Sequence, residues 1–275
     1  MSRSFTAACV QLASDTEPEA NLRAAAEAIR RARDAGADLV LTPETTDMME
    51  MKRAAAFAKA QGEGEHAGLA GLRALAAELG CWLAIGSLVI RLGEERLANR
   101  SFLIDPTGRV AARYDKIHMF DVAVPDGQSY RESRAYRPGG AAVVADLPWG
   151  RLGLSVCYDL RFPQLYRALA RAGADFLAVP SAFTRLTGRA HWHVLLRARA
   201  IETGSFVLAA AQCGETSQGR QTYGHSLIVA PWGEVLAEAG EAPEVILAEI
   251  DPARVAEARA RIPALGHDRA FAAPA

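Results

Sequence analysis

The chain has 275 residues, and 50% of them are hydrophobic, which is enough to bury a large core. Its 31 lysines and arginines nearly balance its 32 aspartates and glutamates. Because the charges balance, the protein has no overall positive electrostatic field that would attract nucleic acid or an anionic membrane. We therefore expect a small molecule as the partner. We expect residues 1–275 to form one compact domain.

The cysteines and the N-terminus indicate the compartment. The four cysteines lie far apart, and no CxxC pair occurs. MSRS runs directly into FTAACVQL, without the charged start and long apolar run of a signal peptide. No uninterrupted apolar stretch approaches the roughly 20 residues that a membrane span requires. We therefore expect a soluble, cytoplasmic protein with reduced thiols.

The first part of the chain alternates predicted strands and helices. Residues 5–13 are predicted as a buried strand, and the alanine-rich amphipathic helix after it begins at Pro18 and ends at Gly36. The next predicted elements are the strand ADLVLTPE, helical segments near 50–60 and 69–80, and the strand CWLAIGSLVI. ANRSFLID and RVAARYDK are predicted as a hairpin, which makes the sheet mixed.

Residues 118–141 carry Pro, Gly, Asp and Ser without periodicity, so we predict a long functional loop there. The alternation then resumes. The predicted elements are the strands VVADLPWG and RLGLSVCYD, a helix over 163–173, the strand ADFLAVPS, the helix AHWHVLLRARAIETG, the strand SFVLAAAQC, the hairpin YGHSLIVA and EVLAEAG, the strand VILAEI and the helix DPARVAEARARIP. The pattern predicts about a dozen strands.

Two segments of the chain resemble each other. They are RARDAGADLVLTPE (31–44) and ALARAGADFLAVPS (168–181). Each has a helix end, an AGAD turn, an apolar strand and a proline before a polar residue. The match suggests two similar half-folds, although AGAD is also simply a good helix-to-strand turn. An α/β sandwich of two sheets with helices outside accounts for both halves.

Cys157 is the candidate nucleophile. It follows an apolar strand and precedes a helix that begins near Pro163, so we expect its sulfur near helix N-terminal amides, which favour the thiolate. Active sites of parallel α/β sheets lie beyond the carboxyl ends of the strands, where Glu44 and Ser181 also fall. The alternative is an ordinary buried cysteine, as we assume for Cys9, Cys81 and Cys213.

A thiol nucleophile needs a base that takes its proton and, in amide hydrolysis, returns it to the departing amine. Glu44 closes an apolar strand, and enclosure there is expected to raise its pKa toward the range useful for proton transfer. Lys116 ends a hairpin strand, where its ammonium is a candidate for oxyanion stabilisation. Glu132, in the long loop, is a candidate for orienting Lys116 or the substrate. The alternative for each residue is a solvated surface side chain.

No metal site is expected from the sequence, because neither HExxH nor CxxC occurs. His191 and His193 lie two residues apart on a predicted helix and therefore point in different directions. None of the six histidines can be paired with Cys157 from sequence alone.

The order of these motifs resembles the nitrilase, or carbon-nitrogen hydrolase, superfamily: PE at a strand end, DKIHMFD about 70 residues later, and CYDLRFPQ 41 residues after Lys116. The resemblance covers essentially the whole chain and implies a four-layer αββα sandwich that pairs into a homodimer. It also implies that Glu44 is the general base, Lys116 the oxyanion lysine, Cys157 the nucleophile and Glu132 the second glutamate of the family. The backbone N–H of Tyr158 would complete the oxyanion hole, and no cofactor is required.

Two segments resemble the deaminated glutathione amidase branch: PSAFTRLTGRAHWHVLLRARAIETGSFVLAAAQCG and YGHSLIVAPWGEV. This implies a thiol amidase that hydrolyses deaminated glutathione to 2-oxoglutarate and Cys-Gly through a thioester. Because that substrate carries carboxylates at both ends, we expect one or two ligands among Arg161, Arg185, Arg189 and Arg197. The alternatives are an ω-amidase acting on 2-oxoglutaramate, another amidase of the superfamily, an N-carbamoyl hydrolase and a catalytically inert binding protein.

Overall fold

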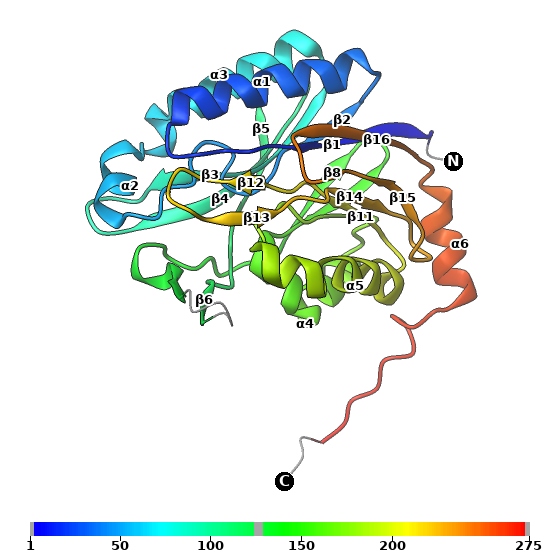
Figure 1. The fold of residues 1–275 in the computed structure, drawn as a ribbon. Helices are drawn as coiled ribbons and strands as arrows, with labels where there is room; N and C mark the ends of the chain where they lie inside the picture. Colours follow the sequence, from blue (N-terminus) through cyan, green and yellow to red (C-terminus); the bar gives the residue numbers. More distant parts are fainter. Residues whose placement is uncertain (1–2, 124–128, 273–275) are drawn as a thin grey trace.

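The computed structural model describes residues 3–123 and 129–272, and two six-stranded sheets form its centre (Figure 1). The first sheet has the order β16-β1-β2-β3-β4-β5, with strands Glu244–Ile250, Phe5–Gln11, Leu39–Leu41, Trp82–Arg91, Leu97–Ile104 and Val110–Asp115. The second has the order β15-β14-β11-β10-β9-β8, with strands Val235–Glu238, Leu227–Val229, Phe206–Ala209, Phe176–Ala178, Gly150–Leu154 and Val143–Leu147. Side chains of both sheets share one hydrophobic cluster, so the sheets pack face to face.

Helices cover the outer face of each sheet. α1 (Pro18–Asp34) and α3 (Ala67–Leu79) cover the first sheet, and α4 (Pro163–Arg171) and α5 (Arg185–Thr203) cover the second (Figure 1). α2 (Arg53–Lys59) and α6 (Ala253–Arg261) lie at opposite sides of this view. The predicted four-layer αββα sandwich is confirmed.

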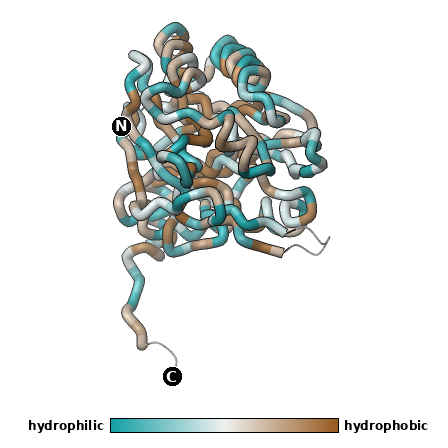
Figure 2. The backbone as a smooth tube through the Cα atoms, turned by 90° about the vertical axis from the view of Figure 1, so that its left-hand side faces the viewer, coloured by the Kyte–Doolittle hydropathy of each residue, from teal (hydrophilic) through white to brown (hydrophobic). Residues whose placement is uncertain are grey.

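Strand β1 is buried on both faces because its sheet lies between a helix layer and the second sheet. Ala8 and Val10 pack in the same cluster as Ile29 of α1, whereas Ala7 and Cys9 pack toward the second sheet. A continuous apolar run, rather than an alternating one, is typical of such a strand. Figure 2 accordingly shows hydrophobic stretches in the interior and hydrophilic ones along the outer helices.

The two sheets repeat one strand pattern. β1, β2 and β3 are parallel in the first sheet, as β9, β10 and β11 are in the second. Antiparallel strands flank each trio, β16 and β4 in the first sheet and β8 and β14 in the second. The repeated segments 31–44 and 168–181 occupy equivalent places, since each contains a helix end followed by the middle strand of a trio. This topology supports the prediction of two similar half-folds.

Several predicted boundaries need correction. Strand β9 ends at Leu154 and does not reach Cys157. Helix α5 begins at Arg185 rather than at Ala190, because the Thr184 side chain caps it by accepting a hydrogen bond from the N–H of Thr187.

The predicted loop over 118–141 also contains regular structure. It includes β6 (Asp121–Ala123), β7 (Ser129–Arg131) and the short helix η2 (Glu132–Arg134), while residues 124–128 lie outside the described part. A further hairpin, β12 (Cys213–Glu215) with β13 (Gln221–Tyr223), was not predicted. The described ranges contain 16 strands rather than about a dozen. No helix within those ranges has the length and apolar character needed to cross a membrane.

Candidate active site

Cys157 lies in a sharp turn between β9 and α4. Its φ is 50°, a left-handed conformation that residues with a side chain rarely adopt. The N–H of Cys157 donates to the carbonyl oxygen of Pro180 at 2.9 Å, and the short helix η3 (Cys157–Arg161) follows. Backbone strain of this kind is retained where the surrounding structure over-determines it, and it concentrates at functional sites.

The buried carboxylate of Asp159 holds this turn in place. It accepts hydrogen bonds from Val156 N at 2.8 Å, from Tyr114 Oη at 2.7 Å and from His118 N at 3.0 Å. The Nδ1 atom of His118 also lies 2.7 Å from Asp159, and its ring stacks on that of Phe162. Burial and the charge of Asp159 raise the pKa of Tyr114, so its phenol remains a donor. The DKIHMFD and CYDLRFPQ motifs therefore meet at one carboxylate.

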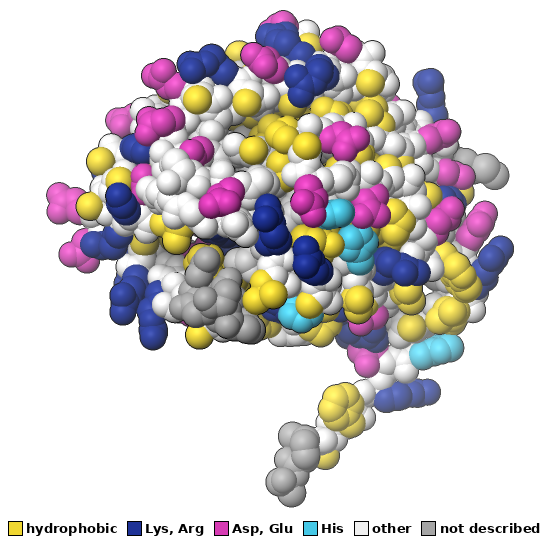
Figure 3. Space-filling model, in the orientation of Figure 1, with side chains coloured by type: hydrophobic (Ala, Val, Ile, Leu, Met, Phe, Trp, Pro, Cys, Tyr) yellow, Lys and Arg dark blue, Asp and Glu magenta, His cyan; other side chains and the backbone are white. Residues whose placement is uncertain are grey.

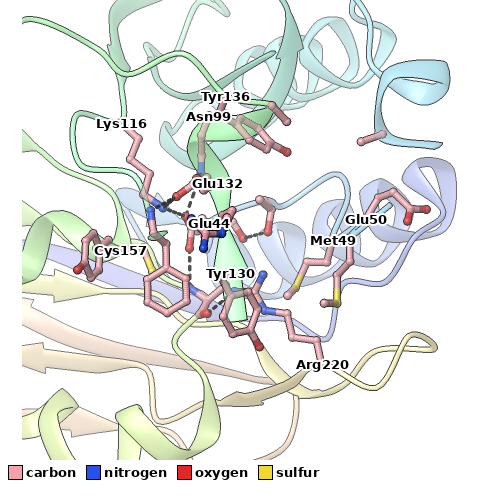
Figure 4. A pocket seen from close by; sticks show the side chains of 18 of the residues that line it. Glu44, Met49, Glu50, Asn99, Lys116, Tyr130, Glu132, Tyr136, Cys157 and Arg220 are labelled. Atoms are coloured by element: carbon pink, nitrogen blue, oxygen red, sulfur yellow. Dashed lines mark hydrogen bonds and ion pairs between the residues drawn. The ribbon is translucent and has the colours of Figure 1, made fainter. Parts of the chain in front are cut away.

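Lys116 is buried between two carboxylates, as Figure 4 shows. Its Nζ donates to Glu44 Oε1 at 2.8 Å and to the two carboxylate oxygens of Glu132 at 3.0 and 2.8 Å. Asn99 Nδ2 bridges the same carboxylates, at 2.9 Å from Glu44 and 3.2 Å from Glu132. Burial alone lowers the pKa of Lys116, but Glu132 and Glu44 outweigh it and hold that pKa well above its usual value. The ammonium therefore stays charged.

Glu44 lies between Lys116 and the thiol of Cys157, and its Oε2 accepts a hydrogen bond from Ala182 N at 2.9 Å. Burial raises the pKa of Glu44, but the Lys116 ammonium and the hydrogen bond from Cys157 together lower it by more than burial raises it. The net shift of this pKa is therefore downward. The prediction of a raised pKa was wrong because attraction to a buried ammonium outweighs the cost of enclosure. Glu44 is therefore an anion at neutral pH.

The thiol form of Cys157 predominates at neutral pH. Burial and the Glu44 anion raise the pKa of Cys157, and Lys116 lowers it by less. The predicted stabilisation of the thiolate by helix amides was wrong, since Cys157 opens only the short helix η3 and α4 begins at Pro163. Attack by the sulfur consequently requires transfer of its proton, and Glu44 is within reach to accept it.

Close approach of β3 to the TPE turn fixes the position of Glu44. A Cβ atom at Gly86 would lie 2.2 Å from the Thr42 carbonyl oxygen and 2.3 Å from that of Pro43, so only glycine fits there. On the other side, Gln212 Nε2 donates to the Glu44 carbonyl oxygen at 3.0 Å. The backbone that carries the carboxylate is therefore held by β3 on one side and by the segment that follows β11 on the other.

These side chains open into a cavity of about 440 Å³, the size of a small-molecule site. Tyr158, whose N–H is the predicted oxyanion donor, lines it beside Cys157. Apolar and aromatic side chains form part of the wall, among them Met48, Met49, Phe120, Tyr136 and Phe183. Five arginines also line the cavity: Arg53, Arg131, Arg134, Arg161 and Arg220.

Comparison with known proteins identifies the family. The family model described as Carbon-nitrogen hydrolase matches residues 6–260. The chain belongs to the carbon-nitrogen hydrolase family. It is 40% identical over 272 residues to the deaminated glutathione amidase of Yersinia enterocolitica, covering 95% of this chain and 92% of that protein. The predicted nitrilase-superfamily membership and the prediction of a hydrolytic amidase are confirmed.

Two solved structures resemble that of this hydrolase. The Caenorhabditis elegans NitFhit protein has a TM-score of 0.89 and 37% identity, with 98% of this chain and 66% of that longer chain covered. A variant of the amidase from Nesterenkonia sp. AN1 has a TM-score of 0.80 and 30% identity, with 92% of each chain covered. That variant carries the acetamide moiety of fluoroacetamide covalently attached at its active site cysteine.

The hydrolase brings one of the four predicted arginine ligands to the cavity. The Arg161 guanidinium lies 5.9 Å from the Tyr158 ring centre and 5.3 Å from that of Phe183. The other three, Arg185, Arg189 and Arg197, lie on α5 outside the cavity lining. The helix buries residues such as Trp192 and Leu196 against the sheet, and Arg197 Nε instead donates to the Gly233 carbonyl oxygen at 2.8 Å.

Arg220 is a cavity residue that the sequence patterns do not predict. It lies just before β13, where its Nη2 donates to the Ala182 carbonyl oxygen at 2.8 Å and its guanidinium lies 5.4 Å from the centre of the Tyr130 ring (Figure 4). Its buried Nε has no hydrogen-bond partner among the described residues. A guanidinium held in place at a cavity wall is suited to bind a carboxylate. It sits in a short hairpin turn, so no periodicity marks it.

Proposed function

We propose that this carbon-nitrogen hydrolase cleaves the amide of deaminated glutathione to 2-oxoglutarate and Cys-Gly, with Cys157 as the nucleophile. One observation carries the proposal. Glu44, Lys116 and Cys157, which are far apart in the sequence, meet at one cavity as a carboxylate, an ammonium and a thiol. The name of the Yersinia enterocolitica relative supports the substrate.

Acylation begins when the sulfur of Cys157 attacks the amide carbonyl carbon and Glu44 accepts the thiol proton. Negative charge then develops on the carbonyl oxygen, where the Lys116 ammonium and the Tyr158 N–H stabilise it. Collapse of the tetrahedral intermediate breaks the carbon-nitrogen bond, and Glu44 returns the proton to the departing amine of Cys-Gly. A 2-oxoglutaryl thioester on Cys157 remains.

Deacylation uses the same groups. Glu44 takes a proton from water, the hydroxide attacks the thioester carbonyl, and the thiolate of Cys157 leaves and recovers the proton. No metal or organic cofactor takes part in either half of this scheme.

Glu132 positions the ammonium. Both of its carboxylate oxygens accept from Lys116, and Oε2 also accepts from Phe120 N at 2.7 Å, which anchors the carboxylate to the β5–β6 connection. A second carboxylate keeps Lys116 charged and oriented while Glu44 is transiently protonated during the reaction.

Arg220 and Arg161 are the proposed ligands for the carboxylates of the substrate. Both line the cavity, and guanidinium groups bind carboxylates through paired hydrogen bonds. Arg161 lies in η3, the short helix that Cys157 opens, and Arg220 contacts the Ala182 backbone beside Glu44. Two cations near the reacting groups suit a substrate with a carboxylate at each end.

Two measurements test the proposal. The ratio of kcat/KM for deaminated glutathione to that for 2-oxoglutaramate is expected to exceed one, because only the former can gain from contacts with Cys-Gly. A tenfold preference for 2-oxoglutaramate would instead make the chain an ω-amidase. Intact-mass analysis after rapid quenching should show a 2-oxoglutaryl adduct on the wild-type chain and none on Cys157→Ala. An inert binding protein would give neither turnover nor adduct.

We also propose that two copies associate through the exposed face of α5. Val194 is 67% exposed and Ile201 is 53% exposed, and the two lie seven positions apart on one helix face. Trp232, 55% exposed, belongs to the turn whose Gly233 approaches Ile201. Light scattering at micromolar concentration should give a dimer mass for wild type and a monomer mass for Ile201→Arg.

A cytoplasmic location is proposed on the basis of the cysteines. All four are free thiols and buried, as expected of a protein that folds where thiols stay reduced. Fractionation of the source cells should recover the amidase activity with the cytosol.

A further inference from the structure

Outside the cavity, two histidines and a glutamate converge on the second half of the sandwich. His193 comes from α5, His225 from the connection between β13 and β14, and Glu238 from the end of β15. One ligand atom of each lies within 4.8 Å of the other two. We propose that these three side chains bind a divalent transition metal ion, with Zn²⁺ as the best fit.

The distances suit a tetrahedral ion. His193 Nε2 lies 2.9 Å from Glu238 Oε1, and His225 Nδ1 lies 3.0 Å from the same oxygen. Zinc–ligand bonds of about 2.0–2.1 Å in a tetrahedron place the ligand atoms about 3.3 Å apart, so small side-chain shifts admit the ion. Two imidazoles and one carboxylate form a known zinc donor set, and water fills the fourth position.

The backbone holds two of the ligands in place before the ion arrives. His225 has a left-handed φ of 56°, its N–H donates to the Gly240 carbonyl oxygen at 3.1 Å, and its carbonyl oxygen accepts from Trp192 Nε1 at 2.7 Å. Trp192 is buried and directly precedes His193 on α5. The indole thus links both histidines, which lowers the ordering cost of binding an ion.

An ion can reach the three side chains from solvent. The side chains of His193, His225 and Glu238 are 34%, 21% and 39% exposed. Figure 3 shows histidine and acidic side chains gathered together on one face of the molecule.

The three side chains could not be grouped from the sequence, because they come from three separate elements of the fold. Pairing His193 with its neighbour His191 gave no site, and the structure shows why. His191 Nδ1 lies 3.2 Å from Arg161 Nη1, toward the cavity arginine, whereas His193 faces the β13–β14 connection. The spacing of histidines along α5 therefore could not reveal this site, because its other two ligands, His225 and Glu238, come from the β13–β14 connection and from the end of β15.

The ion would connect α5 to β15 and to the turn after β13. The same part of α5 contacts the cavity wall, since the Trp192 ring packs on that of Phe183 at 4.9 Å between ring centres. An ion that binds only the folded chain stabilises it in proportion to the logarithm of its free concentration. Bound Zn²⁺ is therefore expected to raise the Tm.

The experiment uses the full chain without an affinity tag, stripped of metal by a chelator and dialysed. Calorimetric titration with Zn²⁺ should show one site per chain at micromolar affinity or better, and the Tm should rise with added Zn²⁺. His193→Gln, His225→Asn and Glu238→Gln should each weaken binding by about tenfold or more. Asn is chosen at 225 because it tolerates a left-handed backbone. His267→Gln, which changes a histidine outside the group, is the matched control and should bind like wild type.

The same titration on Cys157→Ala excludes binding by the active-site thiol, since that variant should keep the full affinity for Zn²⁺. Circular dichroism establishes that each variant is folded. The proposal is overturned if wild type binds no Zn²⁺ below millimolar concentration, or if the three ligand variants bind it as tightly as wild type and the His267→Gln control.

Discussion

Replacing Glu44 with glutamine removes one charge and keeps the shape of the side chain. The carboxylate accepts hydrogen bonds from Lys116 Nζ at 2.8 Å and Asn99 Nδ2 at 2.9 Å on one oxygen, and from Ala182 N at 2.9 Å on the other. Because an amide has only one oxygen, its NH₂ group would face a donor in either orientation. The variant therefore loses the base and leaves at least one buried donor without an acceptor.

The size of each effect follows from these contacts. An unsatisfied buried donor costs about 1–3 kcal/mol in the free energy of unfolding. Orphaning a buried charge costs about 3–5 kcal/mol, but Lys116 keeps both oxygens of Glu132, so the smaller range applies. Loss of a general base lowers the rate by about 10²–10⁴-fold. Glu44→Gln should thus fold with reduced stability and lose nearly all turnover.

The assay compares kcat/KM for deaminated glutathione with the thermal stability and circular dichroism of the same preparation. Glu50→Gln is the matched control, because Glu50 also lines the cavity but contacts Lys59 and Gln218 instead of Cys157. Activity of Glu44→Gln within tenfold of wild type, or an equal loss in Glu50→Gln, would refute the role of Glu44 as the base.

The same variant should shift the titration of the nucleophile. Burial and the Glu44 anion both raise the pKa of Cys157, so removing the anion leaves burial opposed by the Lys116 ammonium, and the pKa falls toward the usual thiol value. The thiolate then forms at lower pH. The pH dependence of alkylation by iodoacetamide measures this midpoint, and an identical midpoint in wild type and Glu44→Gln would contradict the assigned contact.

Cys157→Ala should fold and lose turnover entirely, whereas Cys213→Ala, a buried cysteine of β12, should stay active; comparable activity loss in both would indicate packing rather than chemistry. Lys116→Met should lose about 10²–10³-fold in kcat, as for other oxyanion donors, with circular dichroism to check folding. A kcat near wild type would remove Lys116 from the mechanism. Arg220→Met should raise KM for deaminated glutathione by about 10–100-fold, with a smaller change in kcat. This factor corresponds to the free energy that one charge-assisted hydrogen bond contributes to binding. Arg197→Met, outside the cavity, should leave KM unchanged, and equal KM values for both variants would argue against Arg220 as a ligand.

The strands and helices were largely predictable because their patterns are local. β1 is a continuous apolar run between two covered faces, and α1 shows helical periodicity between Pro18 and Gly36. The start of α5 was missed because its first turn, RLTG, carries little apolar signal and depends on the Thr184 cap. The hairpin of β6 and β7 was missed because its strands are short and mostly exposed.

The site was predictable to the extent that motifs carry it. Glu44, Lys116 and Cys157 stand out by their place at strand ends and by their order along the chain, and they do converge. Their protonation states could not be predicted, because these depend on which charges lie within about 3 Å. For Glu44, burial alone would raise the pKa, whereas the net shift is downward. Arg220 could not be predicted either, since only the three-dimensional path of the β12–β13 hairpin brings it to the cavity.

The repeated half-fold explains why these residues can act together. Glu44 follows β2, the middle strand of the first parallel trio, and the segment from Pro180 to Ala182 follows β10, its counterpart in the second. These two strand ends face each other, because Ala182 N donates to Glu44 Oε2. Within the second half, the Pro180 carbonyl oxygen accepts from Cys157 N. The base therefore belongs to one half and the nucleophile to the other, and each is held by backbone of the second half. Neither half carries a complete proton-transfer pair, so the chemistry depends on the packing of the two sheets and not on either motif alone.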